Sequence, residues 1–257
     1  MFGKPGGGVV FVNALILIGA GFLGGIMNAL AGGATLLTFP AMLLTGLPPV
    51  VATASNALAV TPGHTMAVIA DRAMVPRNRS IFIGLILAAV GGLLGALLLL
   101  ATSERFFTLL VPALIAIATV LFAIGPRIQK ATAARTHVGG TRSAWLLPVS
   151  IYGGYFGAGL GVMLLALLAL TGKEPLRTLN ALKNLYATVA ALAGVVLFAA
   201  SGVIDWPSTL VMLVGALAGG FAGGKLVGVL PAQTVRAAIV VLGAAMTVAY
   251  AWRFWFA

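Results

Sequence analysis

The sequence lacks cysteine altogether and has few charged residues. Its 257 residues contain no Cys and four Asp or Glu, and charged residues make up 7% of the chain. The absence of cysteine excludes disulfides, thiolate metal sites and cysteine nucleophiles. Soluble globular domains average about 25% charged residues. The composition is therefore not that of a soluble domain, and no segment is long and polar enough to form one.

The residues that carry enzyme chemistry are also missing as a group. The sequence shows no paired carboxylates, no metal-ligand spacing, no nucleophile triad and no phosphate-binding loop. Catalysis needs groups of this kind held close together. We therefore expect a protein that is not an enzyme and that holds no cofactor and no metal.

Apolar residues take the place of the missing charges. They make up 61% of the chain and form long runs separated by short polar stretches. A helix satisfies its own backbone hydrogen bonds in lipid and needs about 20 apolar residues to cross, whereas a barrel shows short alternating strands. We predict an all-α, multi-pass helical membrane protein, with the lipid bilayer as a partner. The candidate helical segments are 9–31, 33–47, 51–70, 81–101, 106–125, 144–158, 160–171, 180–201, 208–229 and 234–252.

Basic residues mark the boundaries of these segments. The chain has 15 Lys and Arg and a formal charge of +11, and such a balance can indicate nucleic acid binding. Here the basic residues lie between apolar runs, so they indicate membrane topology and contact with anionic lipid, and no nucleic acid partner is expected. The basic stretch PRIQKATAARTHVGGTRS predicts a cytoplasmic linker at 126–143, between a first membrane repeat at 1–125 and a second at 144–257.

A weak internal repeat relates the two halves. GIMNALAGGATLL at 25–37 aligns with GGYFGAGLGVMLL at 153–165, and further on Asn56 aligns with Asn184. Self-similarity of this kind is the mark of a duplicated architecture. We therefore interpret the halves as two copies of one membrane unit.

Glycine-rich breaks at 31–33 and 159–161 set the expected topology. If each half begins with a helical hairpin broken there and continues with about three spanning helices, most Lys and Arg fall on the cytoplasmic side, more than with four crossings per half. An odd number of crossings makes the two repeats inverted, and discontinuous helices then meet at a binding site near the bilayer midplane. Irregular backbone at that depth is tolerated where it lines a cavity.

The polar residues around these breaks are the expected substrate-binding site. A helix that begins just after a break directs free N–H groups and its positive dipole end at the cavity, which favours an anion. Close helix packing remains the alternative for the glycines, as interhelical hydrogen bonding does for the amides. The predicted substrate-binding residues are Asn28, Gly32, Gly33, Thr35, Ser55, Asn56, Gly159, Gly161, Lys183 and Asn184.

Two titratable residues stand out within apolar segments. Lys183 has no acidic neighbour after Glu174; facing the interior it needs a counter-anion, which a substrate can supply, and otherwise it reaches the headgroups at the helix end. His64 is a candidate for coupling transport to protons, because imidazole titrates near physiological pH. A hydrogen-bonded structural histidine is the alternative. Sodium stays open as the coupling ion.

These features resemble the TauE/SafE family of sulfite and organosulfur-anion exporters. The resemblance rests on the first glycine-rich break, the arm with a proline followed by TGLPPVVATASNAL, and GGYFGAGLGVMLLALLALTGKEPLRTLNALKNL in the second half. It implies a secondary transporter of the bacterial inner membrane, an exporter of small anions such as sulfite, thiosulfate or organosulfonates. NALAGG departs from the denser Gly-x-Gly-Gly-Gly run usual in the family, so Asn28 is a candidate for substrate specificity. An anion channel and a non-transporting assembly partner are the alternatives, and a homo-oligomer is left open.

Overall fold

A computed structural model describes residues 7–30, 33–133, 142–171, 174–226 and 232–256. These residues form ten α-helices and no strand, which confirms the predicted all-α class. The first five helices are α1 (Gly7–Leu30), α2 (Thr35–Leu44), α3 (Pro49–Ala70), α4 (Arg79–Ala101) and α5 (Glu104–Ala133). The second five are α6 (Arg142–Tyr155), α7 (Leu160–Thr171), α8 (Leu176–Ala200), α9 (Trp206–Leu226) and α10 (Ala232–Ala251).

The helices follow the apolar segments of the sequence one for one, and the differences lie at their ends. A short 3-10 turn, Arg72–Met74, follows α3, and a π-helical turn, Trp252–Phe256, follows α10. Helix α5 continues to Ala133, so the stretch predicted as a linker at 126–143 begins inside a helix. Its residues 134–141 lie outside the described part of the chain.

Six of the described helices are long and apolar enough to cross a membrane: α1, α4, α5, α8, α9 and α10. Helices α2 and α7 are apolar but too short to cross alone. The six long helices expose large apolar side chains, among them Phe221, which is 71% exposed, and Val241, which is 69% exposed. Outward-facing apolar side chains of this size suit lipid rather than water, and the chain is a multi-pass membrane protein.

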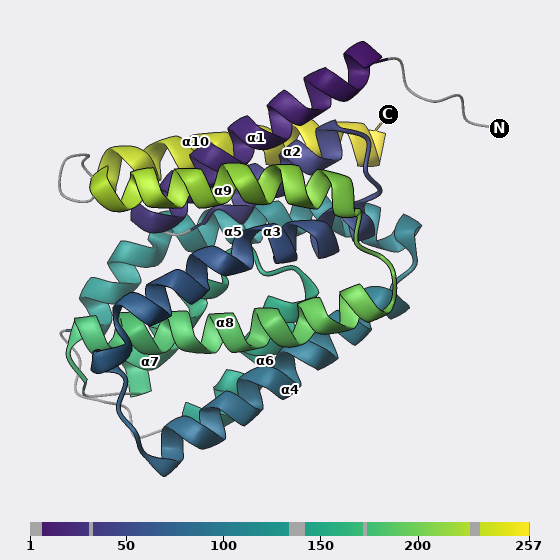
Figure 1. The fold of residues 1–257 in the computed structure, drawn as a ribbon. Coiled ribbons are helices and arrows are strands. Elements are labelled where there is room, and N and C mark those ends of the chain that lie inside the picture. Colours follow the sequence, from purple (N-terminus) through teal and green to yellow (C-terminus); the bar gives the residue numbers. More distant parts are fainter. Residues whose placement is uncertain (1–6, 31–32, 134–141, 172–173, 227–231, 257) are drawn as a thin grey trace.

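The helices form two groups with a shared middle (Figure 1). Helices α1, α9 and α10 lie along one edge, while α4, α6, α7 and α8 lie along the other, and α3 and α5 run between them. Contacts between α3 and α8 and between α5 and α10 join the groups. The helix contacts of the two halves correspond. If α1–α5 are matched in order with α6–α10, the contact between α1 and α9 corresponds to the contact between α6 and α4. This correspondence agrees with a duplicated chain.

Glycine allows the two most extensive helix pairs to approach closely. A Cβ atom on Gly219 of α9 would collide with the backbone of Phe22 on α1, and one on Gly154 of α6 would collide with the backbone of Gly92 on α4. In lipid, helices associate by close van der Waals contact rather than by the hydrophobic effect. Small residues at these positions therefore hold α1 to α9 and α4 to α6.

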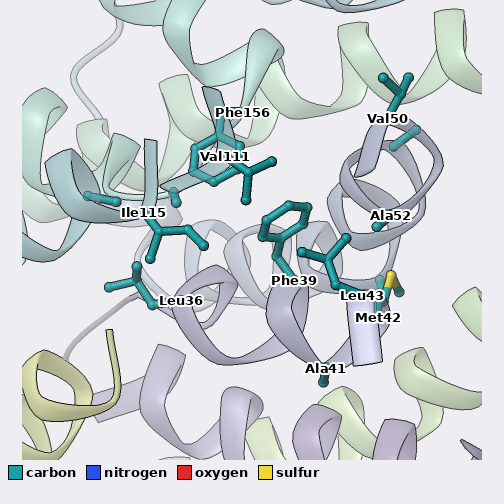
Figure 2. Close-up of a cluster of buried hydrophobic side chains, with 14 of the residues drawn as sticks. Leu36, Phe39, Ala41, Met42, Leu43, Val50, Ala52, Val111, Ile115 and Phe156 are labelled. Atoms are coloured by element: carbon teal, nitrogen blue, oxygen red, sulfur yellow. The ribbon is translucent and has the colours of Figure 1, made fainter. Parts of the chain in front are cut away.

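The short helix α2 lies inside the protein. Its side chains Leu36 and Phe39 point at Val111 and Ile115 of α5 and at Phe156, which follows α6 (Figure 2). The rings of Phe39 and Phe156 meet edge to face, with centroids 5.2 Å apart. Aromatic pairs of this geometry add about 0.5–1.5 kcal/mol beyond burial. The contact joins the short helix of the first half to the break in the second.

Candidate functional site

Both halves contain a helix break where the sequence places its glycine-rich runs. In the first, α1 ends at Leu30 and α2 begins at Thr35, and Gly33 has a φ of +87°. In the second, α6 ends at Tyr155 and α7 begins at Leu160. Gly32 lies outside the described residues.

The second break lies slightly earlier than the sequence predicts. It covers residues 156–159, where Gly157 and Gly159 have φ values of +78° and +81°. Only glycine adopts this left-handed backbone without a steric penalty. Gly161, which was expected to be part of the break, is instead the second residue of α7.

One turn of α5 supports both breaks. A Cβ on Gly33 would lie 2.8 Å from the ring of Phe122, and a Cβ on Gly159 would lie 3.5 Å from the backbone of Ala118. The hydroxyl of Tyr152 donates a hydrogen bond of 2.7 Å to the carbonyl of Ala158 and fixes the second break. The two discontinuous segments are therefore held close to the same helix.

The starts of the two short helices have fewer free N–H groups than expected. The N–H groups of Leu36 and Leu37 in α2 donate to carbonyls of the preceding turn, and so do those of Val162 and Met163 in α7. The sequence predicted free N–H groups at these starts. Because a short turn already uses these donors, they are not free to bind a ligand, and the helix starts contribute their dipoles alone.

A cavity lies between the breaks and the middle of α3 and α8. Its lining includes Thr35 of α2, Asn56 and His64 of α3, and Gly157 of the second break, while α8 contributes mainly small and apolar residues. The space open to the centres of water-sized molecules is about 40 Å³, and one water needs roughly 10–15 Å³. The cavity thus has room for a few waters or one small polyatomic ion.

His64 meets the second half of the chain at this cavity. The side chain of Asn184 on α8 lies next to the imidazole, and Lys183 is close enough to act electrostatically on the ring. The Cδ atom of Lys183 also lies 3.8 Å from the place where a Cβ on Gly161 would be. The structure thus brings together His64, Asn184, Lys183 and the first turn of α7, although Asn184 and Lys183 are not among the residues that line the cavity.

Asn56 and Asn28 differ in their surroundings. The Oδ1 atom of Asn56 is buried at the cavity and has no hydrogen-bond partner among the described residues. The side chain of Asn28 points at Gly63, with Nδ2 2.6 Å from the place where a Cβ would be. Asn28 therefore contacts α3 one residue before His64 but does not line the cavity.

The side chain of Ser55 points away from the cavity. Its Oγ accepts a hydrogen bond of 2.9 Å from the backbone N–H of Asp205, just before α9 begins. The carboxylate of Asp205 in turn accepts a bond of 3.0 Å from the N–H of Ser208 in the first turn of α9. Ser55 therefore joins α3 to the start of α9 and does not reach the cavity.

The sequence analysis did not place Thr53, Gly153 and Gly154 in the site, although all three line the cavity. Thr53 could have been found from helical spacing, because Thr53, Asn56 and His64 recur on one face of α3. No pattern in the sequence indicates which glycines of α6 face a cavity rather than a neighbouring helix.

Comparison with known proteins identifies the family of this chain. Residues 5–250 match the family described as "Sulfite exporter TauE/SafE". The chain belongs to the TauE/SafE family. The predicted resemblance is thereby confirmed over nearly the whole chain.

Relatives of this TauE/SafE protein have transporter names. A Haemophilus influenzae protein named "Probable membrane transporter protein" is 31% identical over 90% of this chain and 92% of the relative. The Escherichia coli K12 "Probable membrane transporter protein YfcA" is 29% identical over 93% and 91%. The Sinorhizobium "Probable membrane transporter protein ORF9" is 27% identical over 89% and 88%. No solved structure matches the chain. The family and these names support a membrane transporter of the TauE/SafE type.

Proposed function

We propose that this TauE/SafE protein is a secondary transporter that exports small anions such as sulfite, thiosulfate or organosulfonates across the bacterial inner membrane. The substrate site is the cavity between the two helix breaks. The two halves are inverted repeats, and movement of one helix group relative to the other opens the cavity to each side in turn. This movement is supported by the two-group arrangement of the helices (Figure 1).

The observation that carries the proposal is the position of Lys183. Its side chain approaches the first turn of α7 and the imidazole of His64, and no described acidic residue forms an ion pair with it. A charge inside a membrane protein is costly unless it is paired. A small anion bound beside His64, at the edge of the cavity next to Lys183, is the counter-charge that this lysine lacks, and the dipole of α7 favours the same sign of ligand.

Polar groups of the first half complete the proposed site. Asn56 and threonines of α2 and α3 line the cavity. The amide NH2 group of Asn56 can donate to an anion, whereas its free Oδ1 is an acceptor. An anion held between α3 and α8 contacts both halves of the chain, and this is the arrangement that alternating access requires. His64, which contacts Asn184 and lies beside Lys183, is the proposed proton carrier.

Ligand-dependent thermal unfolding followed by flux tests the proposal. Detergent-purified protein is melted with sulfite, thiosulfate, sulfoacetate, acetate and chloride, and each anion that stabilises it is then measured for flux in proteoliposomes. A ligand at 100 times its Kd adds about 2.7 kcal/mol of stability. Selective stabilisation with matching flux is the expected result. Conductance far above carrier turnover would instead show an anion channel, and no stabilisation together with a protein that co-purifies in fixed ratio would show an assembly partner.

A further inference from the structure

The end of the cavity at Asn56 differs from the end at His64. The two residues lie eight positions apart on α3, about 12 Å along the helix axis. The side chain of Asn56 is 2% exposed, and its Oδ1 has no hydrogen-bond donor among the described residues. A buried acceptor without a donor is costly. The Asn56 end of the cavity therefore calls for a ligand that an oxygen can bind.

Thr53 adds a second acceptor next to Asn56. Its hydroxyl donates a hydrogen bond of 2.9 Å to the carbonyl of Pro49, one turn earlier in α3. A hydroxyl has one proton and two lone pairs, so the bond uses the proton and leaves the oxygen able to accept. Thr53 and Asn56 are three residues apart, which makes them neighbours on the helix surface, and both line the cavity.

Helix α6 ends at the same cavity. Gly153 and Gly154 belong to its last turn and line the cavity. The last four carbonyls of a helix have no intrahelical donor, and among the described residues no backbone N–H donates to the carbonyl of either glycine. The C-terminal end of a helix also carries a partial negative charge. This side of the second break therefore favours a cation, whereas the start of α7 on its other side favours an anion.

The kinds of oxygen present indicate the class of cation. Calcium and magnesium are normally bound with carboxylates, and none of the described residues that line the cavity is acidic. Neutral oxygens suit an ion with a single charge, and carbonyls at the ends of broken helices coordinate sodium in transporters. The space of about 40 Å³ for water-sized molecules also lets waters fill the remaining coordination positions.

We infer that the Asn56 end of the cavity is a binding site for a small monovalent cation such as sodium. Its ligands are Oδ1 of Asn56, Oγ1 of Thr53 and carbonyl oxygens at the end of α6. This site goes beyond the proposed anion transport and does not require it. A second statement rests on the proposed function: an anion at the His64 edge and a cation at Asn56 attract each other, so each should strengthen the binding of the other.

Thermal unfolding in different salts tests the site. Detergent-purified protein is melted in sodium, potassium and choline chloride at equal concentrations and without a substrate anion, so that chloride and ionic strength stay constant. Sodium should stabilise wild type more than potassium or choline does, and the shift should grow with sodium concentration, as binding to the native state requires. Equal melting temperatures in the three salts would overturn the inference.

Two variants test the assigned ligands. Asn56→Leu keeps a branched side chain without the oxygen, and Thr53→Val keeps the shape without the hydroxyl. We expect Asn56→Leu to weaken the apparent affinity for sodium about tenfold or more, and Thr53→Val to weaken it less. In choline chloride, Asn56→Leu should melt at the wild-type temperature or above, because it removes a buried acceptor that has no donor. Thr53→Val also serves if Asn56→Leu does not fold.

Thr119→Val is the matched control for these variants. Thr119 on α5 is also buried, and its hydroxyl donates a hydrogen bond of 2.7 Å to the carbonyl of Ile115, but it does not line the cavity. It should keep the wild-type response to sodium. If Asn56→Leu and Thr53→Val keep that response as well, sodium binds elsewhere and the inference is wrong.

Thiosulfate binding, measured by thermal shift in sodium and in choline salts, separates this inference from the proposed function. Tighter thiosulfate binding in sodium is the expected result, and equal affinity in the two salts would refute the mutual strengthening. Stabilisation by sodium, with no anion that binds or moves, would refute the proposed anion transport and leave the cation site in place. Anion binding without any effect of sodium would refute the cation site alone.

Discussion

His64 on α3 and Asn184 on α8 lie next to each other across the boundary between the two halves of the chain, and His64 lines the central cavity. Neither residue has its partner nearby in sequence. Here a histidine from the first half of the chain meets the Lys183–Asn184 pair from the second half. The following predictions concern this contact, the ligand beside it and the packing that holds it in place.

Replacement of Lys183 by glutamine should remove anion binding with little loss of folding. The change keeps a long polar side chain next to Gly161 but removes the charge that the anion balances. Thermal unfolding should show that the anions that stabilise wild type no longer do so, and flux should fall in parallel. Lys225→Gln, at the exposed end of α9, is the control and should keep the wild-type response. An unchanged anion response in Lys183→Gln would remove this residue from the site.

Replacement of His64 by glutamine should separate anion exchange from proton coupling. Glutamine can still bond to Asn184 but cannot carry a proton at physiological pH. We expect anion exchange between equal anion pools to continue, while flux driven by a pH gradient across proteoliposomes falls to the level without a gradient. The same vesicles supply both measurements, so exchange is the internal control. Equal gradient-driven flux in wild type and His64→Gln would assign the coupling to another group or to sodium.

Gly219 and its neighbour Gly220 should respond in opposite ways to alanine. A methyl group on Gly219 collides with the backbone of Phe22, whereas Gly220 has nothing within 4 Å. Overpacking of this kind costs about 1–3 kcal/mol. Gly219→Ala should therefore lower the melting temperature in detergent, and Gly220→Ala should leave it equal or higher, because alanine favours the helix. Equal melting temperatures for the two variants would show that α1 and α9 do not pack through this glycine.

Tyr152→Phe should loosen the second break. The hydroxyl of Tyr152 donates to the carbonyl of Ala158 at 2.7 Å, and the ring remains in the variant. Leaving a carbonyl unsatisfied costs about 1–3 kcal/mol when it is buried, so both stability and anion affinity should decrease.

Tyr155→Phe is the matched control on the same helix. The hydroxyl of Tyr155 makes one long contact of 3.5 Å with Thr102, away from the break. It should change the melting temperature less than Tyr152→Phe and leave anion affinity unchanged. The same loss in both variants would point to a general effect on α6 rather than to the break.

The sequence by itself determined the class of the protein and the places where its helices break. Apolar runs of sufficient length force helices in lipid, since each backbone group must be satisfied within the segment, and the glycines mark positions where φ becomes positive, as at Gly33 and Gly159. The family could also be identified from the sequence, because its motifs are short runs of consecutive residues. These properties depend on neighbours in the chain, which a sequence shows directly.

The tertiary structure alone decided which polar residues meet. Ser55 and Asn56 are adjacent and equally polar in sequence, yet one holds the start of α9 and the other lines the cavity. In the sequence, nothing distinguishes Arg236 from other basic residues near helix ends. In the structure, its guanidinium lies over Phe122 of α5 and close to Gly125, next to Val162 of α7. Residues one position apart on a helix point about 100° apart, so the neighbouring helices determine which of them reaches the site. That choice depends on long-range packing, which local sequence patterns do not contain.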